Sequence, residues 1–373
     1  DKFRMLYKSE KPMDDDVFNA SQVKVLLITQ HVPHYRIPIY NMISNRVNLT
    51  ILHSQTNLKQ HACHFNEEFT PLGSIGPFLY FKTPIRKFCK KYDVVIAESN
   101  IRFVDRNILL INPWKKYKWI SWGIGQAASY TKRLGDRDFF RLFRLFLQKK
   151  SDASILYSDY PINAYIEAGI SKKSIFVANN TVSLSSISRP ISDKNILLFI
   201  GTLYKQKKLE ELIYAYKRAV SKCTLQYPLI IIGDGDEREA LEELVLKCDL
   251  IHKITFVGNI VDHKILSEYF SKALVCISPG QAGLGVLTSM ANSVPFITRR
   301  DAITGGEIFN INSSNGVIYD SIDDLISLIC DISDNRDKYI KMGRNARNYY
   351  ISCRLPEHMV NSIIDSIDYV LRK

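Results

Sequence analysis

Short apolar runs alternate with helical patterns along the whole chain. In the first half, the apolar runs lie at residues 23–30, 47–54, 92–99, 118–123, 153–158 and 175–180. The first of them, VKVLLITQ, is continuously apolar rather than alternating, which is typical of a strand buried on both faces of a parallel sheet. These runs therefore predict an α/β domain in the first half of the chain.

The same alternation starts again after a serine-rich stretch with one proline. The expected strands lie at 195–202, 227–235, 254–259, 273–278 and 295–298, with helices at 208–220, 236–248 and 263–272. Strand–helix alternation at this spacing predicts a doubly wound parallel sheet. Two such halves predict two Rossmann-like domains that face each other across a cleft. In open α/β sheets, ligands bind beyond the carboxyl ends of the strands.

The expected boundaries divide the chain into five segments. The start of the chain has no apolar core of a signal peptide, so it is expected to be a disordered tail or an addition to the natural chain. The last helix is amphipathic and is expected to cross back onto the first domain. The segments are the tail 1–20, an N-terminal Rossmann-like domain 21–183, a linker 184–194, a C-terminal Rossmann-like domain 195–356 and the returning helix 357–373.

Composition places the chain among folded proteins, with 46% hydrophobic and 24% charged residues. No uncharged run reaches the ~18 residues that span a bilayer. The net charge of +12 implies attraction to polyanions such as nucleic acid, anionic lipid or phosphorylated substrates. Nucleic acid is not expected as a partner, because the sequence has no basic-aromatic RNA motif and no helix-turn-helix signature.

The seven scattered cysteines indicate reduced thiols in a cytoplasmic protein. His61, Cys63 and His64 lie close together, but no partner pair follows at metal-ligand spacing. A polar loop is therefore expected there, and no metal site.

One stretch combines a glycine-punctuated loop with a helix and a buried strand. It reads SPGQAGLGVLTSMANSVPFIT and covers residues 278–298. The backbone N–H groups of such a loop at a helix N-terminus can bind an anion. The stretch itself has no acidic and no basic side chain.

Together with its neighbours, this stretch resembles the retaining glycosyltransferases of the GT-B fold, family 4. LLFIGTLYKQKKLEELIYAY resembles their strand, basic diphosphate clamp and helix, and IIIGDGDEREALEEL is similar to their GDGPERERLE signature. In the first half, QHVPHYRIPIYN, SWGIGQ and the stretch from DASILYSDY to VANNTV resemble sugar transferases from bacterial surface-polysaccharide clusters. The resemblance implies sugar transfer from a nucleotide-sugar with retention and without a metal. It also implies that the donor binds to the second domain and the acceptor to the first.

The resemblance implies a set of donor-binding residues and two departures from the family pattern. The family's two glutamates fall on Gly280 and Thr288, and its clamp arginine falls on Thr202. Lys207 keeps its place and is expected to stabilise the leaving diphosphate. The donor-binding residues are Gly201, Thr202, Lys205, Lys207, Asp234, Gly280, Gln281, Gly283, Leu284, Gly285 and Thr288.

Two acidic residues near the donor have alternative interpretations. Glu307 contacts the sugar, as a catalytic candidate, or caps the next helix. Asp234, in the GDGD stretch, is a turn former or a ligand.

The acceptor side is expected at residues that follow strands of the first domain. His34 and Glu98 are candidate bases, because each can take a proton from an acceptor hydroxyl. Asn180 and Thr181 are expected to form a hinge. The remaining acceptor-binding candidates are His31, Tyr35, Arg36, Asn100 and Gln126.

The helix DRDFFRLFRLFLQKK has an apolar and a basic side. One interpretation is a helix that packs its apolar side into the core and leaves the basic side in water. The other is an interfacial helix on the anionic surface of the inner membrane, supported by the basic-aromatic stretch FKTPIRKFCKKYD. The apolar side carries Phe139, Leu142, Phe143, Phe146 and Leu147, and the opposite side Arg137, Arg141, Arg144 and Gln148.

The leading hypothesis is a bacterial, cytoplasmic, peripherally membrane-bound glycosyltransferase. It would extend a lipid-linked oligosaccharide for lipopolysaccharide O-antigen or capsule, using a UDP-, GDP- or dTDP-sugar and no further cofactor. With retention, the donor diphosphate acts as base; with inversion, Glu98 or His34 does.

Two rivals remain. The first is a degenerate GT-B subunit that binds a partner transferase; the lost glutamates favour it, whereas the glycine loop and Lys207 oppose it. The second is a GT-B sugar-nucleotide epimerase, which would need more carboxylates in the cleft.

Overall fold

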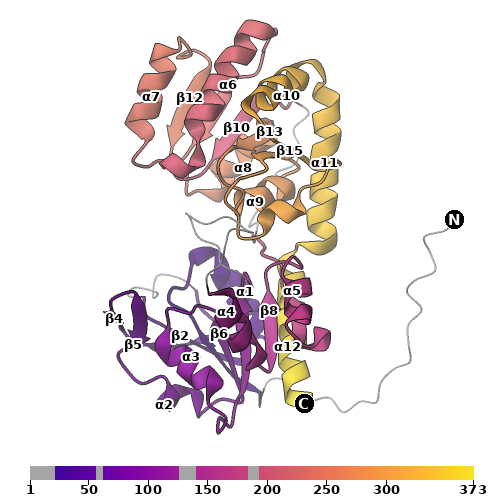
Figure 1. The fold of residues 1–373 in the computed structure, drawn as a ribbon. Helices are drawn as coiled ribbons and strands as arrows, with labels where there is room; N and C mark the ends of the chain where they lie inside the picture. The colour runs from indigo at the N-terminus through magenta and orange to yellow at the C-terminus, as the bar shows by residue number, and fades with distance from the viewer. Residues whose placement is uncertain (1–21, 56–61, 126–139, 184–192) are drawn as a thin grey trace, which may run out of the picture.

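The structure is a computed structural model that describes residues 22–55, 62–125, 140–183 and 193–373. These residues form two α/β domains, one above the other in Figure 1. The expected tail 1–20 and residues 184–192 of the expected linker lie outside the described residues.

The N-terminal domain is built on a seven-stranded parallel sheet with the strand order β3-β2-β1-β6-β7-β8-β9. Its central strands are the continuous apolar runs of the sequence, because helices cover both faces of the sheet. The strands are β1 (Lys24–Ile28), β2 (Asn48–His53), β3 (Asn66–Phe69), β6 (Val94–Glu98), β7 (Lys118–Gly123), β8 (Ala153–Leu156) and β9 (Ile175–Val177).

The C-terminal domain repeats this design with six parallel strands in the order β12-β11-β10-β13-β14-β15. The expectation of two doubly wound parallel-sheet domains is therefore confirmed. The strands are β10 (Ile196–Ile200), β11 (Leu229–Ile232), β12 (Ile254–Gly258), β13 (Ala273–Ser278), β14 (Phe296–Arg299) and β15 (Gly316–Tyr319).

Helices connect the strands in both domains. In the N-terminal domain they are α1 (Ile37–Ser44), α2 (Arg86–Cys89), α3 (Val104–Ile111), α4 (Arg141–Lys149) and α5 (Ile162–Glu167). In the C-terminal domain they are α6 (Leu209–Lys222), α7 (Arg238–Lys247), α8 (His263–Lys272), α9 (Gly285–Ala291), α10 (Ile322–Asp334) and α11 (Arg336–Cys353). Local signals begin several of them: Asp262 caps α8, and Ser321 and Asp324 form a capping box on α10.

The last helix, α12 (Pro356–Arg372), follows α11 but packs on the N-terminal domain (Figure 1). It contacts α1, β8 and β9, and it buries Met359, Ile363 and Ile367 in the core of that domain. Proline at its first turn suits a helix start, because the missing N–H would have no intrahelical partner there. The chain therefore crosses between the domains twice, once before β10 and once between α11 and α12.

Some strands were not among those predicted from the sequence. β3 (NEEF) is a polar edge strand, and β4 (Leu72–Ile75) and β5 (Phe78–Phe81) form a separate antiparallel hairpin. β3 and β4 are not buried on both faces, and neither shows a continuous apolar run. β5 is the short apolar run FLYF, which the sequence interpretation did not assign to a strand.

The strand order of each sheet reverses at one place, between β1 and β6 in the first domain and between β10 and β13 in the second. At such a switch point, the loops after the two strands run in opposite directions and leave a crevice at the carboxyl edge. The residues that follow β1, β6, β10 and β13 are therefore the place to look for a site.

Candidate active site

Lys207 is the central residue of the C-terminal half of the site. It ends a short 3-10 helix, Lys205–Lys207, in the loop that follows β10. Gly201, with φ +148°, ends the strand, and a Cβ at this position would lie 2.9 Å from the Lys207 Nζ. Burial lowers the pKa of Lys207 to about 8. Lys207 is half-buried, and an anionic ligand would replace the hydration that its ammonium has lost.

The protein does not neutralise this ammonium itself. Within the described residues, no carboxylate forms an ion pair with Lys207, whereas the adjacent Lys208 pairs with Asp301 at 3.5 Å. The Tyr204 ring centroid lies 5.5 Å from the Lys207 Nζ. Thr202 and Lys205 are exposed in the same loop. The loop therefore presents one half-buried cation with exposed polar groups around it.

We call residues 201–208, between β10 and α6, the clamp loop, and residues 279–284, between β13 and α9, the glycine loop. The two loops face each other across the switch point of the sheet. β13 ends at Ser278, and α9 begins at Gly285 after Gly283 and Leu284. No side chain of the described residues caps α9, although the Val286 N–H donates to the Gly283 carbonyl at 3.0 Å. The positive end of the helix dipole at Gly285 can attract an anion.

Gly280 joins the two loops rather than contacting a ligand. Its N–H donates to the Lys207 carbonyl at 3.0 Å, and its carbonyl accepts from the Ile303 N–H at 2.9 Å. A Cβ at this position would lie 1.9 Å from the carbonyl oxygen of Gln206. Both backbone groups are paired and no side chain fits, so the expected donor contact at Gly280 is not supported by this geometry.

Three other donor candidates already have partners. Thr288 Oγ1 donates to the Leu284 carbonyl at 3.1 Å, and Gln281 Oε1 accepts from the Tyr204 hydroxyl at 2.5 Å. Asp234 accepts from the Gly235 N–H at 2.8 Å and lies 3.4 Å from Arg238. The Asp234 contacts favour the turn-forming interpretation.

Glu307 links the two domains. Its buried carboxylate accepts from Asn180 Nδ2 at 2.8 Å, from the Gly305 N–H at 3.0 Å and from Thr304 Oγ1 at 3.4 Å. The expectation that Glu307 caps the next helix is wrong, because the 3-10 helix Glu307–Asn310 has no side-chain cap. The sequence interpretation did not connect Asn180 with Glu307, since the two residues lie far apart along the chain.

Further contacts hold the domains together at the same place. The rings of Tyr160 and Phe309 stack with centroids 5.0 Å apart. Thr181 Oγ1 donates to the Arg354 carbonyl at 2.6 Å, and the Tyr350 hydroxyl donates to the Val182 carbonyl at 2.6 Å. These two hydrogen bonds connect the segment before β10 with the C-terminal end of α11 and the residue after it, so they join the two places where the chain crosses between the domains.

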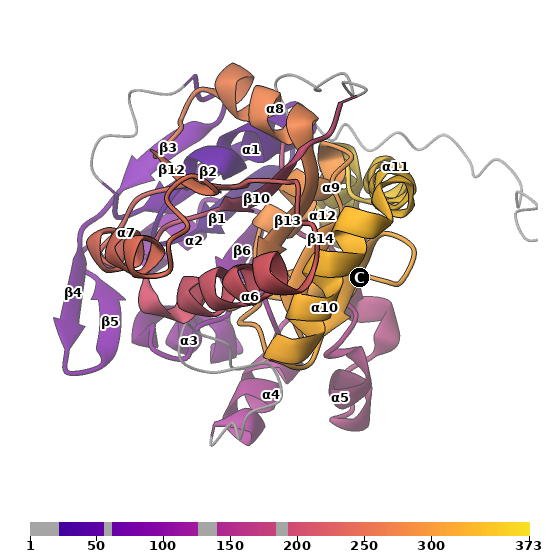
Figure 2. The ribbon, with the colours of Figure 1, turned by 90° about the horizontal axis from the view of Figure 1, so that it is seen from above.

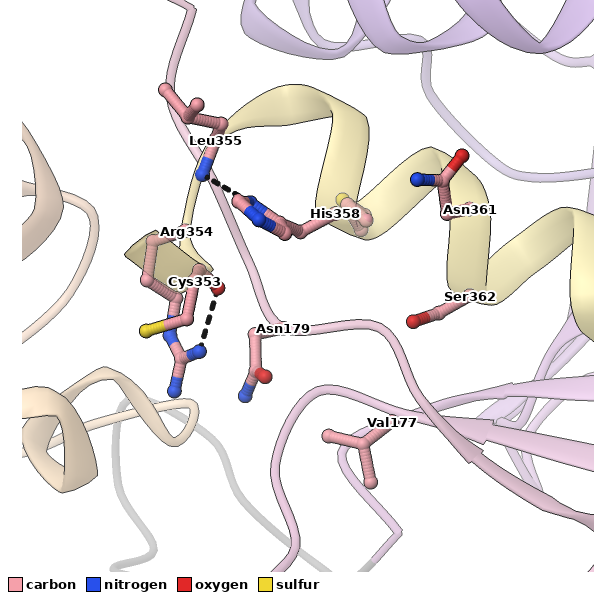
Figure 3. Close-up of a pocket in the computed structure, with 9 residues that line it drawn as sticks. Val177, Asn179, Cys353, Arg354, Leu355, His358, Asn361 and Ser362 are labelled. Atoms are coloured by element: carbon pink, nitrogen blue, oxygen red, sulfur yellow. Dashed lines mark hydrogen bonds between the residues drawn. The ribbon is translucent and has the colours of Figure 1, made fainter. Parts of the chain in front are cut away.

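A cavity of about 300 Å³ lies at this hinge, where α11 meets α12 (Figure 3). Arg354 and His358 point into the region of Asn179, which follows β9. Arg354 Nη1 donates to the Cys353 carbonyl, and His358 Nδ1 accepts from the Leu355 N–H. The pocket residues therefore serve the helix junction and lie apart from the ends of β10 and β13.

Glu98 is the central residue of the N-terminal half. It ends β6 at the switch point, where Thr29 Oγ1, just after β1, donates to Glu98 Oε1 at 2.8 Å. Arg106 Nη1 lies 3.7 Å from Glu98 Oε2. Glu98 and Asn100 both line a cavity of about 630 Å³ between the sheet, α3 and α4. Two acceptor candidates therefore share one cavity, which we call the α4 cavity.

The residues after β1 do not line the α4 cavity. His31 and His34 are exposed, and Tyr35 is half-buried beside His34. Arg36 is buried, with its guanidinium over the rings of Trp122 and Tyr157 at 5.3 and 5.2 Å, and Nη1 donates to the Met359 sulfur. Arg36 therefore anchors α12 to the N-terminal domain, which corrects its assignment as an acceptor contact. Gln126 lies outside the described residues.

Helix α4 is oriented opposite to the core-packing interpretation. Leu142, Phe143 and Phe146 are exposed, at 82%, 46% and 46% of their surface. Gln148 is buried, and it donates to Ser99 Oγ at 2.8 Å and accepts from Ser154 Oγ at 3.0 Å. The side expected to be solvated thus faces the protein.

The basic residues of this helix divide in the same way. Arg144 lines the α4 cavity, so it is not placed on the outer surface as expected, whereas Arg141 is exposed. Arg137 and Phe139 lie outside the described residues.

Arg106 was missed by the sequence interpretation. It is 2% exposed and lies on α3 with its guanidinium 3.4 Å from the Phe103 ring centroid. Burial lowers the pKa of Arg106 to about 10. The signal that could have found it is a lone arginine among the apolar residues of VDRNILLI.

No helix in the described parts of the chain is both long and apolar enough to cross a bilayer. All seven cysteines are free thiols. Among the described side chains, no group of three histidine, cysteine, aspartate or glutamate residues is placed to hold a metal.

Residues 184–349 match the family described as glycosyl transferases group 1. An uncharacterized glycosyltransferase of Methanocaldococcus jannaschii is 32% identical over 108 residues, which are 28% of this chain and 27% of that protein. This chain therefore matches about a quarter of that relative's length. An uncharacterized 41.2 kDa protein from the cps region of Klebsiella pneumoniae is 29% identical over 261 residues, covering 61% of this chain and 68% of that protein.

Several solved structures share the whole architecture. Sucrose-phosphate synthase from Thermosynechococcus elongatus superimposes with a TM-score of 0.69 at 19% identity, covering 94% of this chain and 100% of that one. Anabaena HepE in complex with UDP and glucose gives 0.68 at 15%, covering 93% and 100%. The lipopolysaccharide outer core galactosyltransferase WaaB gives 0.64 at 16%, covering 92% and 99%. The chain has the GT-B fold, and residues 184–349 of its C-terminal half are similar to the glycosyl transferases of group 1.

Proposed function

We propose that this protein transfers a sugar from a nucleoside-diphosphate sugar to a glycan acceptor. The observation that carries the proposal is the half-buried ammonium of Lys207, which has no carboxylate partner among the described residues and lies beside the glycine loop at the switch point. Anabaena HepE has been solved with UDP and with UDP-glucose, which supports a nucleotide-sugar donor here.

In this proposal, the donor diphosphate lies between Lys207 and the first amides of α9. Negative charge grows on the diphosphate as the bond to the sugar breaks. A preorganised ammonium and helix N-terminus stabilise the transition state, in which this charge has grown, more than they stabilise the ground state. The barrier to sugar transfer is therefore lower. The exposed Lys205 and Thr202 add donors around the same phosphates.

We further propose retention without a protein nucleophile or a metal. The attacking hydroxyl enters from the face that the diphosphate leaves, and a diphosphate oxygen takes its proton. Glu98 is poorly placed as a competing base, because its oxygens already lie at 2.8 Å from Thr29 Oγ1 and 3.7 Å from Arg106. The exposed His34 stays the candidate base for the inverting alternative.

The proposed acceptor is a lipid-linked oligosaccharide of a lipopolysaccharide O-antigen or capsule. The relative from a cps region and the similarity to WaaB support this polysaccharide class. The α4 helix supports a site at a membrane, since Leu142, Phe143 and Phe146 are exposed and Arg141 and Lys149 lie on the same helix.

The exposed apolar surface extends beyond α4. Helix α3 contacts both α4 and β5, and all three elements expose apolar side chains. We call the exposed apolar side chains of α4 and of these neighbouring elements the apolar face of the N-terminal domain. Its other members are Ile75, Phe78, Val104, Ile108, Ile111 and Trp114. Apolar side chains with basic neighbours fit the anionic inner-membrane surface.

One observation favours a second candidate function, a non-catalytic GT-B subunit that binds a partner transferase. Gly280 has no side chain and both its backbone groups are paired, and the Thr288 hydroxyl is bonded within its own helix. The two positions where the family places glutamates thus offer the donor little.

Nucleotide binding separates the two candidates. Thermal unfolding is measured with UDP, GDP, dTDP and CMP and with their common sugar conjugates. A ligand at ~100 times its dissociation constant adds about 2.7 kcal/mol to the free energy of unfolding, which is a readily measured shift in Tm. We expect one nucleotide to stand out, and we expect Lys207→Ala to remove its effect while leaving the fold intact. No shift with any nucleotide, in the presence of a lipid-linked acceptor as well, would favour the non-catalytic subunit.

A further inference from the structure

The cavity at the junction of α11 and α12 is lined by an arginine and by several neutral hydrogen-bonding side chains (Figure 3). We call it the hinge cavity. It measures about 300 Å³, which is at the lower end of the range for small-molecule sites. No aspartate or glutamate is among the described residues that line it. The polar side chains of its wall are Asn179, Arg354, His358, Asn361 and Ser362.

Arg354 has more N–H donors than its hydrogen bonds use. Its Nε donates to Asn310 Oδ1 at 2.6 Å, its Nη1 to the Cys353 carbonyl at 2.8 Å and its Nη2 to the Tyr349 hydroxyl at 2.7 Å. A guanidinium has five N–H donors, so these three bonds to described residues leave two donors unused. All three acceptors are neutral, and an anion in the cavity would therefore give this guanidinium a charged partner.

The first two turns of α12 add neutral groups to the same cavity. His358 Nδ1 accepts from the Leu355 N–H at 3.0 Å, so the proton of the neutral imidazole is on Nε2, which can donate. The side chains of Asn361 and Ser362 form no hydrogen bond with any described residue. Figure 3 shows Arg354 on one side of Asn179 and these two side chains on the other. The cavity therefore offers donors from several directions.

The lining of the hinge cavity comes from both domains. Arg354 follows α11, and its bond to Asn310 fixes it to the C-terminal domain. Helix α12 packs on the N-terminal domain, and Asn179 follows β9 of that domain. A ligand held by Arg354 and by α12 would therefore bridge the two domains at the second chain crossing. Such a ligand stabilises the interdomain orientation in which both sets of groups reach it.

We propose that the hinge cavity binds a small oxyanion, a phosphate ester or a carboxylate, and that the bound anion holds the two domains in one orientation. Arg354 binds the anionic oxygens, because its planar donors match the geometry of carboxylate and phosphate. His358, Asn361 and Ser362 bind the other oxygens of the ligand. The inference goes beyond the proposed function, since the hinge cavity lies apart from the ends of β10 and β13 and binding needs no nucleotide.

Three probes that share a glycerol skeleton test the site in the full-length chain. Glycerol 3-phosphate and glycerate are titrated by calorimetry, with neutral glycerol as the comparison. The Lys207→Ala variant serves as the background, because it removes the other expected phosphate site. We expect at least one anionic probe to bind and glycerol to bind at least about tenfold more weakly. Binding of glycerol 3-phosphate alone assigns a phosphate ester, binding of glycerate alone a carboxylate, and binding of both assigns oxyanions of either kind.

A pair of variants locates the bound probe. Asn361→Asp places a carboxylate in the wall of the cavity, at an exposed position on α12 and with almost no change in size. We expect it to weaken binding of the anionic probe about tenfold or more, because like charges repel. Asn348→Asp, at an exposed position on α11 that does not line the cavity, is the matched control and is expected to bind the probe as the background does.

Amide hydrogen exchange, measured by mass spectrometry, tests whether the anion ties the domains together. A saturating anionic probe is expected to slow exchange in residues 349–359 about twofold or more, since it connects the end of α11 with α12. Residues 209–222 of α6, at the far side of the C-terminal domain in Figure 1, should exchange at an unchanged rate. The proposal is overturned if neither anion binds, if Asn361→Asp binds it as tightly as Asn348→Asp, or if the bound anion leaves exchange in residues 349–359 unchanged.

Discussion

Gly280 decides how the clamp loop and the glycine loop meet. The backbone of residues 206–207 passes so close that a Cβ would lie 1.9 Å from the Gln206 oxygen. We expect Gly280→Ala to lower the free energy of unfolding by about 1–3 kcal/mol or more, because the contact is with backbone that cannot move aside. Gly283→Ala is the control, since its Cβ meets nothing within 4 Å, and a change within about 0.5 kcal/mol is expected. Equal destabilisation of both variants in thermal unfolding would contradict this account.

The same residue explains why restoring the family's glutamate would fail. A glutamate at position 280 needs the space that the clamp loop occupies. The sequence alone could show that the glutamate is missing. It could not show that the backbone of another loop takes its place, because that contact joins residues about seventy positions apart.

Lys207 is expected to reduce stability while it serves binding. Its pKa is about 8 in the folded chain, below the usual 10.5, so the unfolded chain binds more protons between these two values. Stability therefore rises as the pH increases from about 8 to about 10.5. We expect Lys207→Met to raise Tm at about pH 7, by an amount equivalent to roughly 1–3 kcal/mol, and to lose nucleotide binding.

The pH dependence of the gain in Tm shows whether it comes from removing the Lys207 charge or from better packing of the methionine side chain. The advantage of Lys207→Met over the unmodified chain should shrink at about pH 9.5, where the folded chain has lost the proton. Lys205→Met, at an exposed position in the same loop, should leave Tm unchanged at both pH values. A Tm for Lys207→Met below that of the unmodified chain at both values would show that the ammonium stabilises the fold instead.

At the scale of elements, α4 tests the proposed membrane surface. Phe143 is 46% exposed in water. We expect Phe143→Ser to leave Tm unchanged or higher, and to weaken binding to anionic lipid vesicles about tenfold or more, since it removes an apolar side chain from the membrane contact. Co-sedimentation with vesicles measures the effect. Tyr214→Ser, on α6 of the other domain and 48% exposed, is the control and should bind vesicles as the unmodified chain does.

The orientation of α4 shows what an amphipathic pattern can and cannot predict. The pattern correctly placed Leu142, Phe143 and Phe146 on one side and Arg144 and Gln148 on the other. It was wrong for Leu147, which is buried like Gln148, and for Arg141, which is exposed like Leu142. It could not tell which side meets the protein, because an apolar stripe is equally compatible with a core and with an external partner. Here Ser99 and Ser154 satisfy the buried Gln148, and these partners come from other elements.

The strands were more readily predicted than the edges of the sheets. β1, β6, β7 and β13 are buried on both faces, and burial alone demands a continuous apolar run. In the hairpin β4–β5, whose strands read LGSI and FLYF, only Phe81 is buried, so the core does not dictate the residue types there. Prediction from the sequence was therefore good where the core dictates the residue type.

At the scale of the whole molecule, two chain crossings and a few side-chain contacts couple the domains. α12 is part of the N-terminal core, yet it continues from α11 of the other domain (Figure 2). Tyr160 and Phe309 stack between the domains, and Asn180 bonds Glu307. Since the proposed donor and acceptor halves lie on different domains, their approach depends on these few contacts.

Weakening one of these interdomain contacts should therefore lower the rate of sugar transfer without changing the affinity for the nucleotide. The stack of Phe309 on Tyr160 contributes about 0.5–1.5 kcal/mol. We expect Phe309→Ser to raise the radius of gyration in X-ray scattering and to lower the transfer rate about two- to tenfold, because closed molecules become rarer. The nucleotide affinity should stay within about twofold, since the donor site lies within one domain. Ile251→Ser, 56% exposed in the turn between α7 and β12, is the matched control. A loss of nucleotide affinity in Phe309→Ser as large as the loss of rate would mean that the donor site itself spans both domains.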